Sequence, residues 1–305
     1  TPLPRYVIRN RQKDNPDIDL NFIRSIDVDK YPENAQQPKM TIEEIMINET
    51  ISSKIKNDIQ LAEKYLNLLL DKPKDIDVKE IRKHLFNIGY QFSMGDKEAS
   101  KNIQEDYFYA IKYLKEAALL GDKTSLYLLA SLLSNNQNTL DVAFKLAEIS
   151  ADLGCSEAFH LIAVFYKNGI AVQSNVIMAA IYFKIAADKG EVSSMFQFAN
   201  IMLQIGQKEI DSSEFNKQLE IAHDIIRSID GKCNRVYKEI RYTLEAIENV
   251  DVALFVSGKY FEMAVLNGND EAKKVMRNID VNSCYNHNHP DFYDDLYQTL
   301  SLDNI

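Results

Sequence analysis

Residues 156–190 read SEAFHLIAVFYKNGIAVQSNVIMAAIYFKIAADKG, which is two apolar helical patterns joined by a short turn and closed by a glycine. The same closing phrase, an alanine-containing helical pattern followed by glycine, recurs at Gly121, Gly154 and Gly268. Gly231 closes a weaker copy, so the closing glycines lie 33 to 41 residues apart. A recurrence of this length with two helices in each unit is typical of a helical solenoid.

The second helix of a unit has its own pattern, with an aromatic residue seven or eight positions before the closing glycine and small residues three or four positions before it. Small residues allow a neighbouring helix to approach, and a glycine just past a helix end adopts the left-handed backbone at little cost. We therefore expect these residues to be structural and not catalytic. They are Tyr113 with Ala117 and Ala118, Tyr182 and Phe183 with Ala186 and Ala187, and Tyr260 and Phe261 with Ala264.

This pattern resembles the Sel-one-like repeat, a relative of the tetratricopeptide repeat. The best-matching unit places Ala158, Ile162, Ala163, Tyr166, Gly169, Ala179, Tyr182, Phe183, Ala186, Ala187 and Gly190 at family positions. Ile88-Gly89, Phe92 and Gly95 begin a first unit, whereas the units at 191–231 and 232–268 are degenerate. The resemblance covers about residues 80–280, and it implies an all-α, right-handed solenoid of about five helix pairs.

The remaining segments differ in composition from the repeats. Residues 1–40 hold five of the seven prolines and are predicted to form an extended arm, with the apolar piece LNFIRSI strapped onto the repeats. Residues 41–79 are predicted to be an N-terminal helical segment that begins with a capping box at Thr41 and Glu44. Residues 80–280 are the repeats, and residues 281–305 are an acidic aromatic tail that either caps the last repeat or docks on another protein.

Composition narrows the class of protein. A formal net charge of −10 argues against general nucleic-acid binding, and the three scattered cysteines form no disulfide ladder. No apolar run is long enough to span a bilayer, so any contact with a membrane complex would be peripheral. The chain begins with Thr, and its first 13 residues carry four basic groups and no acid, which predicts a removed leader and a mitochondrial location, or otherwise a cytoplasmic one.

The family resemblance implies a non-catalytic adaptor or scaffold, here expected to be a mitochondrial assembly or biogenesis factor that binds proteins in a larger complex. Stacked helix pairs curve, and their first helices usually line the concave side. Aromatic groups mixed with Ser, Asn and His suit such an interface, although Phe86, Val164 and Phe196 could instead pack between repeats. The predicted partner-binding residues are Phe86, Tyr90, Tyr127, Ser131, His160, Val164, Phe196, Asn200, Lys238 and Tyr242.

Motifs for other chemistry are sparse. The sequence has no phosphate-binding glycine loop, dinucleotide fingerprint or zinc-protease motif, so we expect neither an enzyme nor a cofactor. One alternative is an RNA-associated helical repeat protein, such as an organellar translation activator or ribosome-associated factor. A second alternative is a small metal-binding protein, because thiolate, imidazole and carboxylate are zinc ligands. The weak candidate ligands are Cys284, His287, His289 and Asp291.

Overall fold

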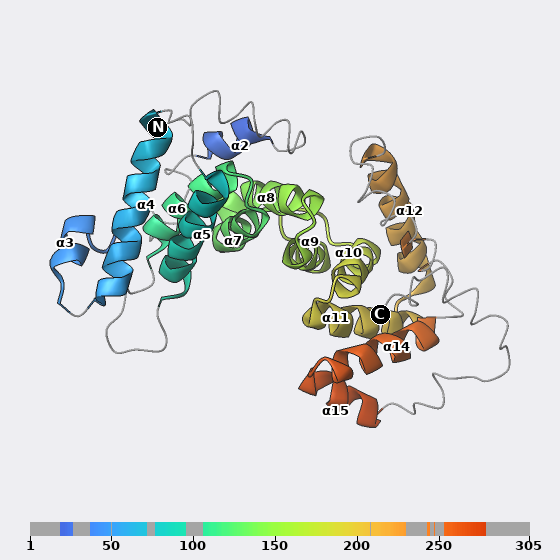
Figure 1. The fold of residues 1–305 in the computed structure, drawn as a ribbon. Coiled ribbons are helices and arrows are strands. Elements are labelled where there is room, and N and C mark those ends of the chain that lie inside the picture. Colours follow the sequence, from blue (N-terminus) through green and yellow to red (C-terminus); the bar gives the residue numbers. More distant parts are fainter. Residues whose placement is uncertain are drawn as a thin grey trace. The chain divides into compact units, whose positions relative to one another are not determined.

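The computed structural model describes residues 19–26, 37–49, 51–71, 77–95, 106–207, 209–229, 243–244, 247 and 253–278. Throughout these ranges the regular elements are helices, as Figure 1 shows, so the predicted all-α class is confirmed. The chain divides into two compact units, Thr1–Cys155 and Ser156–Ile305. Both units are built from packed helix pairs.

The first unit contains two such pairs. Helix α5 (Val78–Met94) packs on α6 (Tyr107–Leu119), and α7 (Lys123–Leu133) packs on α8 (Leu140–Asp152), which follows a 3-10 turn at Gln137–Thr139. Helix α4 (Ser53–Asp71) lies against α5. The short helix α3 (Ile42–Ile47) precedes α4 and has the predicted capping box. Thr41 Oγ1 accepts from the Glu44 N–H at 3.2 Å, and Glu44 Oε2 accepts from the Thr41 N–H at 2.7 Å.

The predicted N-terminal arm contains one short helix, α2 (Leu20–Ser25). The Asp19 side chain accepts the Phe22 N–H and starts this helix, which is why the arm is not extended throughout. Leu20 and Ile23 are buried, and Lys115 of α6 donates to the Ile26 carbonyl at 2.8 Å. The apolar piece therefore straps onto the first repeat, as its sequence suggested.

The closing glycines end their helices in one repeated way. Gly121, Gly154, Gly190 and Gly268 have φ between +81° and +91°. In each case the residue after the glycine donates its N–H to the carbonyl five positions earlier, as in the bond from Asp122 to Ala117 at 3.1 Å. Asp122 then caps α7 by accepting the Ser125 N–H. After Gly121, Gly190 and Gly268, a single polar residue thus closes one helix and caps the next.

The second unit contains α9 (Ser156–Asn168), α10 (Val176–Asp188), α11 (Val192–Gly206), α12 (Ser212–Ile229), α14 (Ala253–Leu266) and α15 (Asp270–Asn278). Helices α9 and α10 form the pair that the sequence matched best. Helix α15 packs on α14, in the place expected for a terminal cap.

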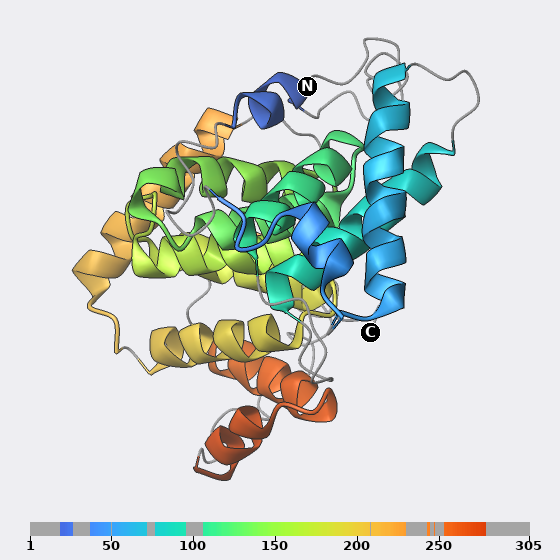
Figure 2. The same cartoon turned by 90° about the vertical axis from the view of Figure 1, so that its left-hand side faces the viewer.

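The sequence interpretation was wrong about the partner of α11. Residues 191–231 were expected to form one unit, with α11 paired to α12. Instead α11 packs on α14, where Ser257 Oγ donates to the Ala199 carbonyl at 2.8 Å and the Phe198 and Tyr260 rings meet edge to face at 4.7 Å. Helix α12 packs on α10, and both views show α14 beside α11 (Figures 1 and 2).

The buried tyrosine of the second helix has a further role in both units. Tyr113 of α6 donates to Glu63 of α4 at 2.5 Å, and Tyr260 of α14 donates to Asp188 of α10 at 2.6 Å. A lysine completes each group, because Lys112 reaches Glu63 at 2.6 Å and Lys184 reaches Asp188 at 2.6 Å. Burial is the main cause that raises the pKa of both tyrosines, which therefore remain donors at neutral pH. Because Glu63 of α4 accepts from Tyr113 as Asp188 of α10 accepts from Tyr260, α4 lies where the second helix of a preceding pair would lie.

Candidate protein-binding surface

The described partner-binding candidates fall in pairs four residues apart, on the first helix of each helix pair. Four-residue spacing puts each pair on one helix face. Tyr90 is 43% exposed and the other seven are half-buried, so none is a fully buried core residue. The pairs are Phe86 and Tyr90 on α5, Tyr127 and Ser131 on α7, His160 and Val164 on α9, and Phe196 and Asn200 on α11. Lys238 and Tyr242 lie outside the described residues.

Helix α5 turns one side away from its neighbours. We define the α5 face as the residues at three- and four-residue spacing along this side: Lys79, Lys83, Phe86, Asn87, Tyr90 and Met94. Five of these six residues are exposed, and Phe86 is half-buried. The rings of Phe86 and Tyr90 stack with centroids 6.0 Å apart, and Met94 continues the apolar stripe at 43% exposure.

The other sides of α5 are occupied. Gly89 allows close contact with α6, since a Cβ built there would lie 2.8 Å from Leu114 Cγ. His84 Nε2 lies 2.9 Å from the Asp58 carbonyl of α4, and its ring meets Tyr65 edge to face. Two neighbouring helices therefore fix the orientation of α5, and the α5 face is what they leave open.

Helix α7 contributes less accessible candidates. Tyr127 and Ser131 are half-buried, and the Ser131 carbonyl accepts a hydrogen bond from Ser134 Oγ at 2.7 Å. The hydroxyl of Ser134 thus helps to end α7.

In the second unit, His160 is held by its own chain. Its Nδ1 lies 2.7 Å from Ser194 Oγ and 3.1 Å from Glu191 Oε2, and its ring meets Phe183 edge to face. Glu191 also caps α11 by accepting the N–H groups of Ser193 and Ser194. Burial by itself would raise the pKa of Glu191, but hydrogen bonds from His160 and Ser194 outweigh burial and lower the pKa to about 2.

The first helices of the second unit are also linked to each other and to α14. Lys167 Nζ of α9 donates to Gln197 Oε1 of α11 at 2.7 Å. The Phe196 ring meets the Phe261 ring of α14 edge to face at 6.0 Å. Phe196 thus packs between helices, the alternative that the sequence left open, whereas Val164 and Asn200 remain half-buried candidates.

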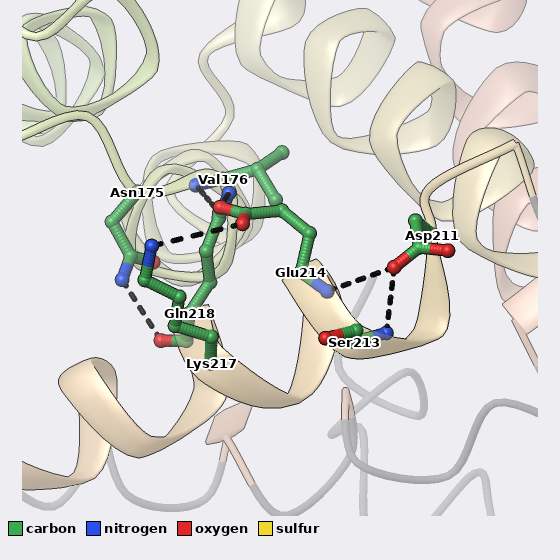
Figure 3. Close-up of polar contacts among 7 residues, drawn as sticks. All are labelled: Asn175, Val176, Asp211, Ser213, Glu214, Lys217 and Gln218. Atoms are coloured by element: carbon green, nitrogen blue, oxygen red, sulfur yellow. Dashed lines mark hydrogen bonds and ion pairs between the residues drawn. The ribbon is translucent and has the colours of Figure 1, made fainter.

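Sequence reasoning missed a polar junction between α10 and α12, drawn in Figure 3. Asn175 caps α10 through Met178 N–H, and its Nδ2 donates to the Gln218 carbonyl at 2.8 Å. Gln218 Oε1 accepts the Val176 N–H at 2.7 Å, which satisfies a free donor in the first turn of α10. An Asn before an apolar run signals a helix start, but nothing local to Asn175 indicates the contact with α12.

Two other sequence expectations concern metals and membranes. The candidate ligands Cys284, His287, His289 and Asp291 lie outside the described residues. Within the part of the chain that the structure describes, no group of three or more His, Cys, Asp or Glu side chains could hold a metal ion. None of the described helices has the length and apolar character that crossing a membrane requires.

The comparisons with known proteins find similar solved structures, among them the two described here. No family profile and no curated protein matches the chain. Among solved structures, a protective antigen of uropathogenic Escherichia coli displaying an SLR fold is 14% identical, with a TM-score of 0.37, over 88% of this chain and 65% of that one. A Sel1 repeat protein from Oxalobacter formigenes is 16% identical, with a TM-score of 0.37, over 82% of this chain and 97% of that one. Both are Sel1 repeat proteins, the family that the sequence resembles.

Proposed function

We propose that this protein is a non-catalytic scaffold that binds partner proteins through the first helices of its helix pairs. The observation that carries the proposal is the exposed aromatic and methionine stripe on α5. Among the described residues, the other exposed large apolar side chains are Ile47 and Leu266, each on a different helix. Exposed aromatic anchors flanked by polar groups are typical of protein interfaces. The half-buried candidates on α7 and α9 extend the proposed binding surface within each unit.

We further propose that the protein assists the assembly or biogenesis of a mitochondrial complex. Four basic residues and no acid in the first 13 positions support this location. Subcellular fractionation of the native organism, with the protein detected by mass spectrometry, tests it directly. Recovery in mitochondria supports the proposal, and recovery only in the cytosol contradicts it.

Affinity capture from the native organism tests the scaffold function. We expect the full-length chain to retain a reproducible set of proteins, and Tyr90→Ser combined with Tyr127→Ser to reduce their yield at least fivefold, because a few aromatic anchors carry most of an interface's affinity. Leu266→Ser is the matched control, since Leu266 is 80% exposed but lies on a second helix. Circular dichroism checks that all variants fold. Capture of the bait alone, with folded protein, would contradict the scaffold function.

A further inference from the structure

We infer that the α5 face is a docking site for an acidic amphipathic segment of a partner protein. The inference rests on the proposed scaffold function and adds the chemistry of the partner. The partner segment would place carboxylates on Lys79 and Lys83, and apolar side chains on Phe86, Tyr90 and Met94.

The N-terminal half of the α5 face is basic although the whole chain is acidic. Lys79 and Lys83 are exposed, and neither forms an ion pair with any other described residue. Arg82, half-buried on the next row, adds a third cation. Within the described α5, therefore, this end of the helix presents positive charge to solvent.

The two acidic residues at the start of α5 are engaged in hydrogen bonds within the chain. Glu80, the one acid within the helix, accepts a hydrogen bond from the Tyr65 hydroxyl of α4 at 3.3 Å. Asp77, which precedes the helix, caps it by accepting the N–H groups of Lys79 and Glu80. Glu80 borders the α5 face but is hydrogen-bonded to Tyr65, and neither it nor Asp77 forms an ion pair with Lys79 or Lys83. The two lysines are therefore available to an external anion.

The C-terminal half of the α5 face is apolar. Phe86 and Tyr90 form a stacked pair, and Met94 lies one turn beyond with a flexible thioether that adapts to different apolar partners. A face that runs from Lys79 to Met94 is about 22 Å long at 1.5 Å per residue. It matches an amphipathic helix of about 15 residues that carries acids at one end and apolar groups at the other.

Two other occupants fit this face less well. Nucleic acid would need cations along its whole length, but Asn87, Tyr90 and Met94 supply none. A second copy of this chain carries an acidic aromatic segment at residues 281–305, but its net charge of −10 opposes self-association, and the sedimentation experiment below tests it. Charge complementarity combined with the aromatic stripe therefore favours an acidic amphipathic protein segment.

A peptide-display selection against the full chain tests the inference. The library contains random 15-residue peptides, and the strongest binders are synthesised with a fluorescent label for affinity measurement. We expect enriched peptides to combine Asp or Glu with Leu, Ile or Phe at helical spacing, and to lose affinity as salt rises. Enrichment of basic peptides, or no enrichment at all, would overturn the inference.

Variants of the α5 face locate the binding. Lys79→Glu with Lys83→Glu should weaken an enriched peptide about three- to tenfold at low salt, and Tyr90→Ser about tenfold or more. The charge-matched control is Lys54→Glu with Lys64→Glu on α4, where both lysines are exposed. A peptide with its acids replaced by lysine should bind the Lys79→Glu, Lys83→Glu variant better than the wild type. Equal affinities for all these proteins would overturn the inference.

Two further outcomes separate this inference from the proposed function. If the Lys79→Glu, Lys83→Glu chain still captures the native partner set at wild-type yield, the scaffold function stands and the docking chemistry is wrong. Sedimentation velocity of the chain alone tests the second-copy alternative. Self-association that Tyr90→Ser abolishes would identify a second copy as the occupant and overturn the inference.

Discussion

The α5–α6 pair and the α11–α14 pair are built alike although the chain connects them differently. In both, a glycine of the first helix allows close contact with a leucine of the second, Gly89 with Leu114 and Gly206 with Leu254. The connection runs through residues 95–106 in one pair and 207–252 in the other. Because the entropy cost of closing a loop grows only slowly with its length, the contact surfaces and not the connection decide which helices pair.

The two pairs differ in what their first helices leave open. On α5 the rings of Phe86 and Tyr90 stack on one another, and Tyr90 and Met94 are exposed to solvent. On α11 the corresponding aromatic, Phe196, packs against Phe261, and the neighbouring groups are hydrogen-bonded to α9. Groups already satisfied within the chain contribute to its stability and offer less to a partner. We therefore expect partner binding mainly in the first unit.

The largest expected effect comes from blocking the close contact between helices. A Cβ at Gly206 would lie 2.6 Å from Leu254 Cγ and 3.0 Å from the Leu254 nitrogen, so Gly206→Val must displace α14. We expect a loss of about 2–3 kcal/mol in the free energy of unfolding, measured with urea. Gly89→Val should cost a similar amount, and Gln204→Val, at an exposed position of α11, should cost little. If Gly206→Val left the free energy of unfolding unchanged, that result would contradict the α11–α14 pairing.

A smaller effect is expected from the tyrosine anchors. Tyr113→Phe and Tyr260→Phe each remove one hydrogen bond to a carboxylate, and the carboxylate keeps its lysine partner. We expect each substitution to lower the free energy of unfolding by about 1.5–2 kcal/mol, because hydrogen bonds to charged groups are the stronger ones. Thermal or urea unfolding of the two variants compares them directly. A large cost at Tyr113 with none at Tyr260 would break the equivalence of the two pairs.

The smallest effect depends on pH and belongs to the second unit. The pKa of Glu191 is lowered to about 2 from an ordinary value of 4.5, so its contribution to stability is present above about pH 4.5 and is lost as the pH falls toward 2. Glu191→Gln should therefore be less stable than the wild type at neutral pH, and the difference should shrink on acidification. Urea unfolding from pH 7 to pH 3 measures this, with Glu220→Gln at an exposed position of α12 as the control. A difference that grows at low pH would contradict the assignment.

Much of the helix-pair architecture could be predicted because its signals are local. The closing glycine, the polar residue after it and the small residues of the second helix each act within one or two turns, so the sequence shows them directly. The partner of α11 could not be predicted, because Gly231 ends a helical pattern without indicating which helix packs there. The aromatic register of Tyr260 and Phe261 did identify α14 as a second helix, but not the first helix that it joins.

The binding candidates show the same limit. Spacing placed Phe86, Tyr90, His160 and Phe196 correctly on first helices. Accessibility depends on contacts between helices far apart in the sequence, such as that of Phe196 with Phe261, and spacing contains no information about these. The role of every candidate in partner binding remains a prediction.

The most direct test of the account is quantitative capture of the native partner set by two double variants, one in each unit. One carries Phe86→Ser with Tyr90→Ser in the first unit, and the other carries Val164→Ala with Asn200→Ala in the second. Both are compared with the wild type at equal amounts of folded protein. We predict that the first variant loses at least four-fifths of the captured protein, in line with the weight of aromatic anchors, and that the second retains most of it. Full retention by the first variant, or loss confined to the second, would contradict the assignment of binding to the α5 face.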